Sequence, residues 1–300
     1  MSQQQVEEIL HDKYLPFTEG ELKEHFVEKM QGDTSNLSRH TDYFKNSIGR
    51  YRQFDGVNAL ATGDVKTVRQ IEKDERFWTV AALMTMYHSH SDIRDTGFIQ
   101  MLAGAFGPTP PLASFSSWEE CLAGDVQLYF EPNLPSPPCY REWLQQNLDH
   151  PIPYVREGAQ NKKGENRANL EGATNVDALL INASNGFAVL IEAKVLSDIS
   201  CQVSYDIKRN QIARNLDVML HSDDTMTSPL NKRSPGNSLF MLLTPQTFKD
   251  NPHARFYGYK FREYATDPRA LANDLPHRGI EELEGLGRRM VGELGGLERD

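Results

Sequence analysis

The sequence predicts an α/β fold with a mostly helical N-terminal region. Early in the chain, apolar residues recur at helical spacing, most clearly over 65–90. Two strongly apolar stretches, 174–183 and 187–195, come later and are separated by an Asn-Gly turn, which is typical of a β-hairpin. A helical stretch at 202–220 and a further apolar strand at 237–244 continue the alternation of helices and strands that indicates an α/β class.

Proline-rich segments divide the chain. Residues 131–139 read EPNLPSPPC, and four prolines so close together exclude a regular helix. Before this segment we expect helices at 18–31, where Thr18 and Glu21 have the spacing of a capping box, and at 94–105. We therefore predict three parts: a helical region over 1–135, a core over 136–265 and a charged, Gly-rich tail over 266–300.

The predicted core has the element order helix, strand, strand, strand, helix, strand. The corresponding stretches are 139–148, 152–160, 174–183, 187–195, 202–220 and 237–244. The stretch FYGYKFREY at 256–264 is expected to be a strand that packs one aromatic face. Its alternation of aromatic and basic residues would also suit stacking on nucleic-acid bases.

Three charged residues interrupt the apolar hairpin. Asp177 lies in its first strand, and Glu192 and Lys194 lie in its second. Because strand side chains alternate between faces, Glu192 and Lys194 share a face, and pairing brings Asp177 opposite them. Buried charges are costly without partners. Two carboxylates and the Ala193 carbonyl suit Mg²⁺, with Mn²⁺ as a substitute, and the lysine could orient or help to deprotonate an attacking water.

Asp177 followed by the triplet Glu-Ala-Lys at 192–194 resembles the signature of the PD-(D/E)XK nuclease superfamily, the restriction-endonuclease-like fold. The predicted element order over roughly 136–245 is similar to that family's common core, a central mixed sheet flanked by helices. Val176 stands before Asp177 where the family pattern has proline. The resemblance implies an enzyme that hydrolyses phosphodiester bonds with a metal ion, and DNA is favoured over RNA as its substrate.

The same resemblance implies further site residues. Many members carry an acidic residue on the helix before the sheet; Glu142 is the first candidate, and Glu171 and Glu157 are alternatives. Some subfamilies carry a glutamine on the helix after the second strand, which matches Gln211. Neighbouring cations could hold the phosphate backbone. They are Lys208, Arg209 and Arg214.

Other interpretations stay open. The charged trio could be a structural ion pair at a strand end, although two carboxylates beside one lysine leave a surplus negative charge. A non-catalytic protein could keep the nuclease fold to bind nucleic acid or protein. An acidic helical half could also imitate a nucleic-acid surface and bind a basic partner without a metal. The N-terminal region could recognise a substrate sequence or structure, bind a protein partner or mediate a homodimer.

The composition is that of an ordinary globular protein, with 39% hydrophobic and 25% charged residues. The net charge is −10, but residues 151–264 carry 14 basic and 12 acidic residues, so the acidity lies outside the predicted site. Three scattered cysteines without a CxxC pair argue against structural zinc. The chain lacks a long apolar run and a secretory signal pattern, so we expect a cytoplasmic protein without a membrane partner.

Overall fold

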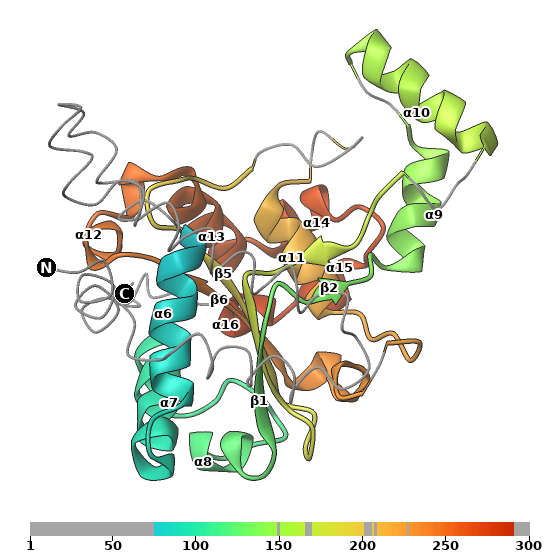
Figure 1. The fold of residues 1–300 in the computed structure, drawn as a ribbon. Helices are drawn as coiled ribbons and strands as arrows, with labels where there is room; N and C mark the ends of the chain where they lie inside the picture. Colours follow the sequence, from blue (N-terminus) through green and yellow to red (C-terminus); the bar gives the residue numbers. More distant parts are fainter. Residues whose placement is uncertain are drawn as a thin grey trace, which may run out of the picture. The chain divides into compact units, whose positions relative to one another are not determined.

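The computed structural model describes residues 75–148, 151–165, 170–200, 206, 209–226 and 228–290. The helix predicted at 18–31 and the substrate-binding candidate Lys208 lie outside these residues. The fold is mixed α/β, as predicted, with a four-stranded sheet flanked by helices (Figure 1). In the described part of the chain, no helix is both long and apolar enough to cross a lipid bilayer.

The chain divides into two compact units. One comprises residues 1–99 and 128–130, and the other comprises residues 100–127 and 131–300. In the first unit, α6 (Glu75–Tyr87) is a helix that buries Leu83 and Met84. This helix and α7 (Ser91–Phe106) confirm the helices predicted around them. The residues of the candidate site all belong to the second unit.

The sheet contains the predicted hairpin and a crossover connection. The sheet runs β1 (Val126–Phe130), β4 (Ala178–Asn182), β5 (Ala188–Ala193) and β6 (Ser238–Leu243). β4 and β5 are the arms of the hairpin and pair antiparallel, with Ala178 opposite Ile191. β5 and β6 pair parallel, which requires a crossover connection, and α11 (Gln211–Met219) lies in that connection and packs against β6.

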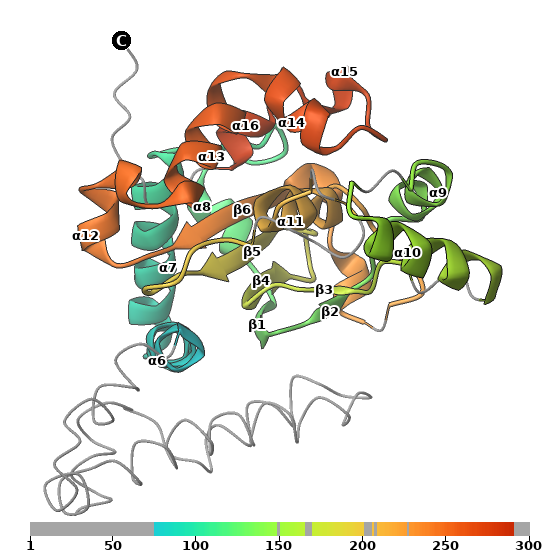
Figure 2. The same ribbon diagram turned by 90° about the horizontal axis from the view of Figure 1, so that it is seen from above.

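The strands of the hairpin lie inside the protein. Every residue of β4 and β5 is buried, which explains why both read as continuous apolar runs instead of alternating patterns. Four helices lie together along the β6 edge of the sheet (Figure 2): α13 (Phe256–Thr266), α14 (Pro268–Asp274), α15 (Ile280–Leu283) and α16 (Leu286–Arg289). Phe261 of α13 stacks on Phe240 of β6 with ring centroids 5.7 Å apart, and Met290 forms a β-bridge with Phe240.

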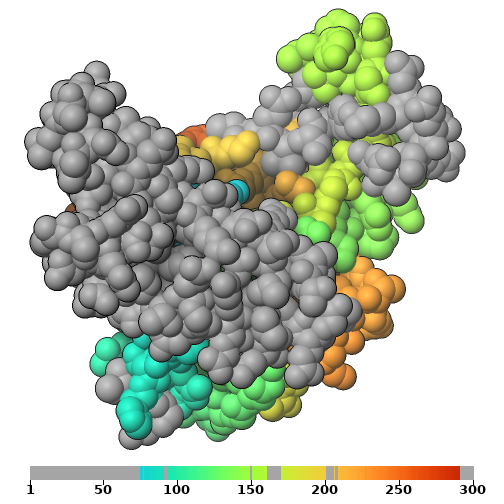
Figure 3. Space-filling view, viewed as in Figure 1, coloured from blue at the N-terminus to red at the C-terminus, as the bar shows by residue number. Residues whose placement is uncertain are grey.

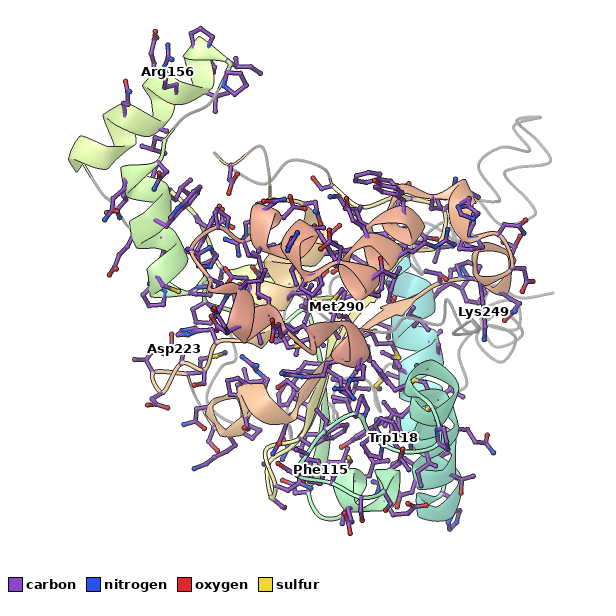
Figure 4. All side chains as sticks on the ribbon, turned by 180° about the vertical axis from the view of Figure 1, so that it is seen from behind. Phe115, Trp118, Arg156, Asp223, Lys249 and Met290 are labelled. Atoms are coloured by element: carbon purple, nitrogen blue, oxygen red, sulfur yellow. The ribbon has the colours of Figure 1, made fainter. Side chains whose placement is uncertain are left out.

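The hairpin turn depends on a glycine and on aromatic packing. Gly186 has a φ of +75°, and a Cβ there would lie 3.1 Å from the Cβ of Ser234. Phe187, next in the chain, contacts the rings of Phe115 and Trp118 at centroid distances of 6.0 and 6.5 Å. Trp118 is the first residue of α8 (Trp118–Leu122), and Phe115 precedes this helix (Figure 4). These contacts fix the turn and therefore the register of both strands.

One predicted strand, residues 152–160, is instead part of helix α10 (Pro153–Glu165). Pro153 occupies the first helical position, where its fixed φ and missing N–H are tolerated. α10 packs through Ala159 against Leu144 of α9 (Pro138–Gln146), the helix predicted at 139–148. α10 lies at the surface of this unit (Figure 3).

The predicted strand at 256–264 is also wrong, because these residues form most of α13. Tyr257, Phe261 and Tyr264 are buried, and their spacing of four and three residues is a helical stripe. Aromatic and basic residues alternate in this stretch, and that alternation concealed the helical spacing of its buried residues. The part of the predicted charged, Gly-rich tail that the structure describes contains the helices α14, α15 and α16.

The core begins earlier than predicted, because β1 precedes residue 136. The Ala183 N–H donates to the Asp125 carbonyl at 3.2 Å, and the Glu131 N–H donates to the Asp177 carbonyl at 3.1 Å. These bonds flank β1 and β4 in the antiparallel sense. A separate two-stranded sheet pairs β2 (Asn133–Leu134) with β3 (Thr174–Asn175).

Gly258 allows α13 to approach a short 3₁₀ turn, η5 (Pro252–Ala254). A Cβ at Gly258 would lie 1.9 Å from the Pro252 carbonyl oxygen. Gly258→Ala should therefore lower the free energy of unfolding by about 1–3 kcal/mol, as overpacking does. The matched control is Gly104→Ala in α7, where a Cβ meets open space and should stabilise by about 0.5–1 kcal/mol. Urea unfolding measures both, and equal midpoints for the two variants would contradict this account.

Candidate active site

Asp177 and Glu192 occupy facing positions at one end of the β4–β5 hairpin. Asp177 immediately precedes β4, and the register that pairs Ala178 with Ile191 places it opposite Glu192 of β5. The Asp177 Oδ2 accepts a hydrogen bond of 2.7 Å from the Ala193 N–H, which ties this carboxylate to the end of β5. Two carboxylates on facing strand positions repel each other unless a cation lies close to them.

Glu192 is buried and held by three donors. Its Oε1 accepts hydrogen bonds from Lys194 Nζ at 2.7 Å and from Gln211 Nε2, and its Oε2 accepts one from Asn215 Nδ2 at 2.9 Å. The residue is only 1% exposed. Burial penalises an ionised carboxylate, and one ammonium and two amides offset that penalty. The same donors fix both carboxylate oxygens in one orientation.

Lys194 follows β5 directly and is also buried. Its N–H donates to the Leu243 carbonyl at 2.9 Å, which extends the parallel ladder beyond the strand. Its Nζ donates to Glu192 and, at 3.1 Å, to the Ala193 carbonyl. The predicted shared face of Glu192 and Lys194 is thus confirmed by a direct ion pair, and the carbonyl expected to bind a metal lies beside the ammonium.

One face of α11 is directed at the site. Gln211, Arg214 and Asn215 lie three and four positions apart, so their side chains leave the same side of the helix. Gln211 and Asn215 donate to different oxygens of Glu192. The predicted role for Gln211 beside the site therefore has a structural basis. Sequence reasoning missed Asn215, although its position one helical turn after Gln211 was the signal that could have found it.

Arg214 binds the segment that leads to Asp177 instead of pointing freely into solvent. Its Nη2 donates to the carbonyls of Gly172 at 3.1 Å and Ala173 at 2.9 Å, and its Nε lies 2.8 Å from Glu171 Oε1. Burial lowers the pKa of Arg214, while the nearby carboxylates of Glu171 and Glu192 oppose that shift. Arg214 is therefore a positioning residue that holds residues 171–173 against α11.

Glu171 is the acidic candidate that the structure brings nearest to this helix. Its side chain is fully buried, and neither carboxylate oxygen receives a hydrogen bond of good geometry, because the close Arg214 Nε is poorly aligned. Glu142, the first candidate, is exposed on α9, and Glu157 is exposed on α10. The structure therefore favours Glu171 over both as a third acid.

Arg209 does not have the predicted role of a substrate-binding cation. It is fully buried, its Nη2 lies 2.8 Å from Asp217 Oδ2, and its guanidinium stacks 3.5 Å from the centroid of the Tyr140 ring. A guanidinium without solvent exposure cannot contact a phosphate backbone. Its proximity to Gln211 in the sequence was misleading, because Arg209 precedes the N-cap Asn210 and turns into the core.

A comparison of the chain with protein-family models, with curated proteins and with solved structures gave no match. The functional inference therefore depends on the residues of the site. Three carboxylates (Asp177, Glu192 and Glu171) lie near two cations (Lys194 and Arg214), which leaves a surplus of negative charge.

The carboxylates of Asp177 and Glu192 are the oxygen donors that the site offers to a divalent cation. In the described residues, no three His, Cys, Asp or Glu side chains gather closely enough to enclose a metal. Mg²⁺ does not need such a cage, since it keeps several waters and takes one or two protein carboxylates. Asp177 and Glu192 supply that number, whereas Glu171 already has a cation beside it, because its Oε1 lies 2.8 Å from Arg214 Nε. The residues fit Mg²⁺ or Mn²⁺ in donor type and charge.

Proposed function

We propose that this chain is a metal-dependent nuclease that hydrolyses phosphodiester bonds in DNA. The observation that carries the proposal is the buried Glu192–Lys194 pair opposite Asp177. A buried ion pair that faces a second carboxylate contributes little to stability, whereas charged groups gathered in one buried place are a candidate functional site.

The sheet topology supports a restriction-endonuclease-like core. β1, β4 and β5 are neighbours in antiparallel order, and α11 then leads to β6, which is parallel to β5. The order strand, strand, strand, helix, strand is the one expected from the sequence resemblance. Helices α9 and α10 lie between β1 and β4 in the chain. The helix that was predicted to come before the three strands is α9, so it belongs to this insertion and not to the core.

In this proposal Asp177, Glu192 and the Ala193 carbonyl hold the cation, which is Mg²⁺ or Mn²⁺. When bound, the cation would polarise the phosphodiester and acidify water. Asp177 is partly exposed, so its carboxylate lies where the buried end of the hairpin meets solvent. Glu192 is oriented by Gln211 and Asn215 through separate oxygens, which keeps its carboxylate from rotating away.

Lys194 supplies the proton chemistry and charge. Its ammonium lies between a carboxylate oxygen and a main-chain carbonyl, so it can donate to a water or phosphate oxygen that enters this position. There it would orient the attacking water and stabilise negative charge on the phosphate. Burial from bulk water strengthens both interactions.

The experiment that tests the metal site is calorimetric titration of Mn²⁺ into the wild type and two acidic variants. Asp177→Asn removes a proposed ligand and should weaken Mn²⁺ binding by more than about tenfold. Glu142→Gln is the matched control, because Glu142 is an exposed acid on α9, and it should bind like the wild type. Equal affinities for all three proteins would contradict the site. A wild type that binds no Mn²⁺ would favour the non-catalytic binding protein.

A further inference from the structure

Two large aromatic side chains of α13 are exposed at the surface. Phe256 is 37% and Tyr259 57% exposed. Their rings stack with centroids 6.2 Å apart and an interplanar angle of 19°. We name this pair the aromatic platform. Leu196, which is 48% exposed, lies only two residues after Lys194.

The sequence of α13 separates a core face from the platform. Tyr257, Phe261 and Tyr264 are buried on the inner side of this helix. Phe256 and Tyr259 are three residues apart and therefore share another side. Exposing two large stacked rings has no benefit for folding, because burial of apolar surface is what stabilises the protein. The platform is therefore a surface on which a planar ligand could stack.

The platform is attached to the proposed site by the segment 195–200. Asp198 accepts hydrogen bonds from the N–H groups of Phe256 at 2.7 Å and Tyr257 at 3.1 Å, and Arg255 Nη2 donates to the Leu196 carbonyl at 3.3 Å. Two residues of chain span at most about 7 Å, so Leu196 stays close to Lys194.

The far end of the same segment is fixed to α11. The Gln211 N–H donates to the Ser200 carbonyl at 3.0 Å, and Gln211 also contacts Glu192. The segment is thus held at Lys194, at the start of α13 and at the start of α11. This attachment gives the platform a defined position relative to the acids.

We propose that the aromatic platform stacks on unpaired bases of the nucleic acid whose phosphodiester lies at Lys194. This inference rests on the proposed nuclease function and narrows its substrate to single-stranded DNA or DNA with a single-stranded end. Every base has a π-face, but a duplex encloses those faces between neighbouring pairs, so side chains stack readily only on unpaired bases.

The charges around the platform favour a polyanion. Arg255 lies immediately before Phe256, and its guanidinium stacks over the Phe248 ring at 4.2 Å. Two acids that contact α13 or belong to it are already engaged: Asp198 accepts from two backbone N–H groups, and Glu263 accepts from Lys260 at 2.7 Å. An apolar protein partner would instead need a broader uncharged surface.

The test is fluorescence anisotropy with a labelled oligothymidylate and with a blunt duplex of equal length, in EDTA so that no cleavage occurs. Tyr259→Ala should weaken binding of the single strand by about tenfold, a typical effect of losing one stacking ring, and leave duplex binding unchanged. Tyr259→Phe should bind like the wild type, because it keeps the ring. Tyr154→Ala, at a tyrosine of α10 that is 85% exposed, is the matched control and should have no effect.

The outcomes separate this inference from the nuclease function. A Tyr259-dependent preference for the single strand supports the platform even if metal-dependent cleavage is absent, in which case the nuclease proposal alone fails. Metal-dependent cleavage with single-strand binding unchanged in Tyr259→Ala overturns the platform and leaves the nuclease. A wild type that does not bind the oligothymidylate overturns the platform as well.

Discussion

Lys194→Met should reduce metal-dependent cleavage by about a thousandfold while the fold is retained. The substitution removes the ammonium that lies 2.7 Å from Glu192 Oε1 but keeps a side chain of similar length. Losing both proton transfer and charge stabilisation accounts for an effect of this size. Glu192 keeps its hydrogen bonds from Gln211 and Asn215 but loses its buried counter-charge, so the variant should also melt at a lower temperature than the wild type. Cleavage is therefore compared below the melting temperature of the variant.

The control for this substitution is Lys232→Met, which changes an exposed lysine of the same size and charge. Initial cleavage rates and thermal melting curves should be measured for both variants and for the wild type. Equal loss of cleavage in both variants would show an effect of total charge on nucleic-acid binding. Full activity of Lys194→Met would remove Lys194 from the mechanism.

The second large effect is expected at Asp217, which lies in α11 away from the proposed chemistry. Its carboxylate is fully buried and pairs with Arg209 Nη2 at 2.8 Å, with His277 Nε2 at 2.9 Å and with Arg278 Nε at 2.5 Å. Asp217→Asn leaves buried cations without their counter-charge, which should lower the free energy of unfolding by about 3–5 kcal/mol. Asp224→Asn, at an exposed aspartate, should change it little.

The stability contribution of Asp217 should depend on pH. Burial by itself would raise the pKa of this carboxyl, but His277, Arg209 and Arg278 outweigh burial and lower it. A lowered pKa in the folded state means that the contribution is present above the ordinary Asp pKa of about 4 and is lost as the pH falls below it. Urea unfolding from neutral to acid pH should therefore show the gap between wild type and Asp217→Asn closing. A gap that stays constant would contradict the assignment.

The central hairpin could be predicted because its information is local. Alternation of side chains along a strand and a short Asn-Gly turn suffice to place Asp177, Glu192 and Lys194 together. Gln211 could be placed beside them only through the resemblance to the nuclease superfamily, in which some subfamilies carry a glutamine on the helix after the second strand. The same local patterns identified β6 and the helix α9.

Other parts of the site depend on tertiary contacts that no local pattern shows. Glu171 faces α11 because Arg214 binds the carbonyls of the segment before Asp177, a tertiary contact that the sequence does not show, so Glu171 was predicted only as an alternative to Glu142. Glu142 has the expected position on a helix, but α9 directs it to solvent. Arg209 looked like a surface cation because its partner Asp217 is eight residues away, across the start of α11.

The central claim is metal-dependent hydrolysis at the end of β5, and the most direct measurement is a cleavage assay of the wild-type protein. Plasmid, linear duplex, single-stranded DNA and RNA should each be incubated with Mg²⁺, with Mn²⁺ and with EDTA. The account predicts that DNA is cut when either metal is present, and that EDTA abolishes cutting. Intact substrates under every condition, from a folded protein that also binds no Mn²⁺, would contradict it.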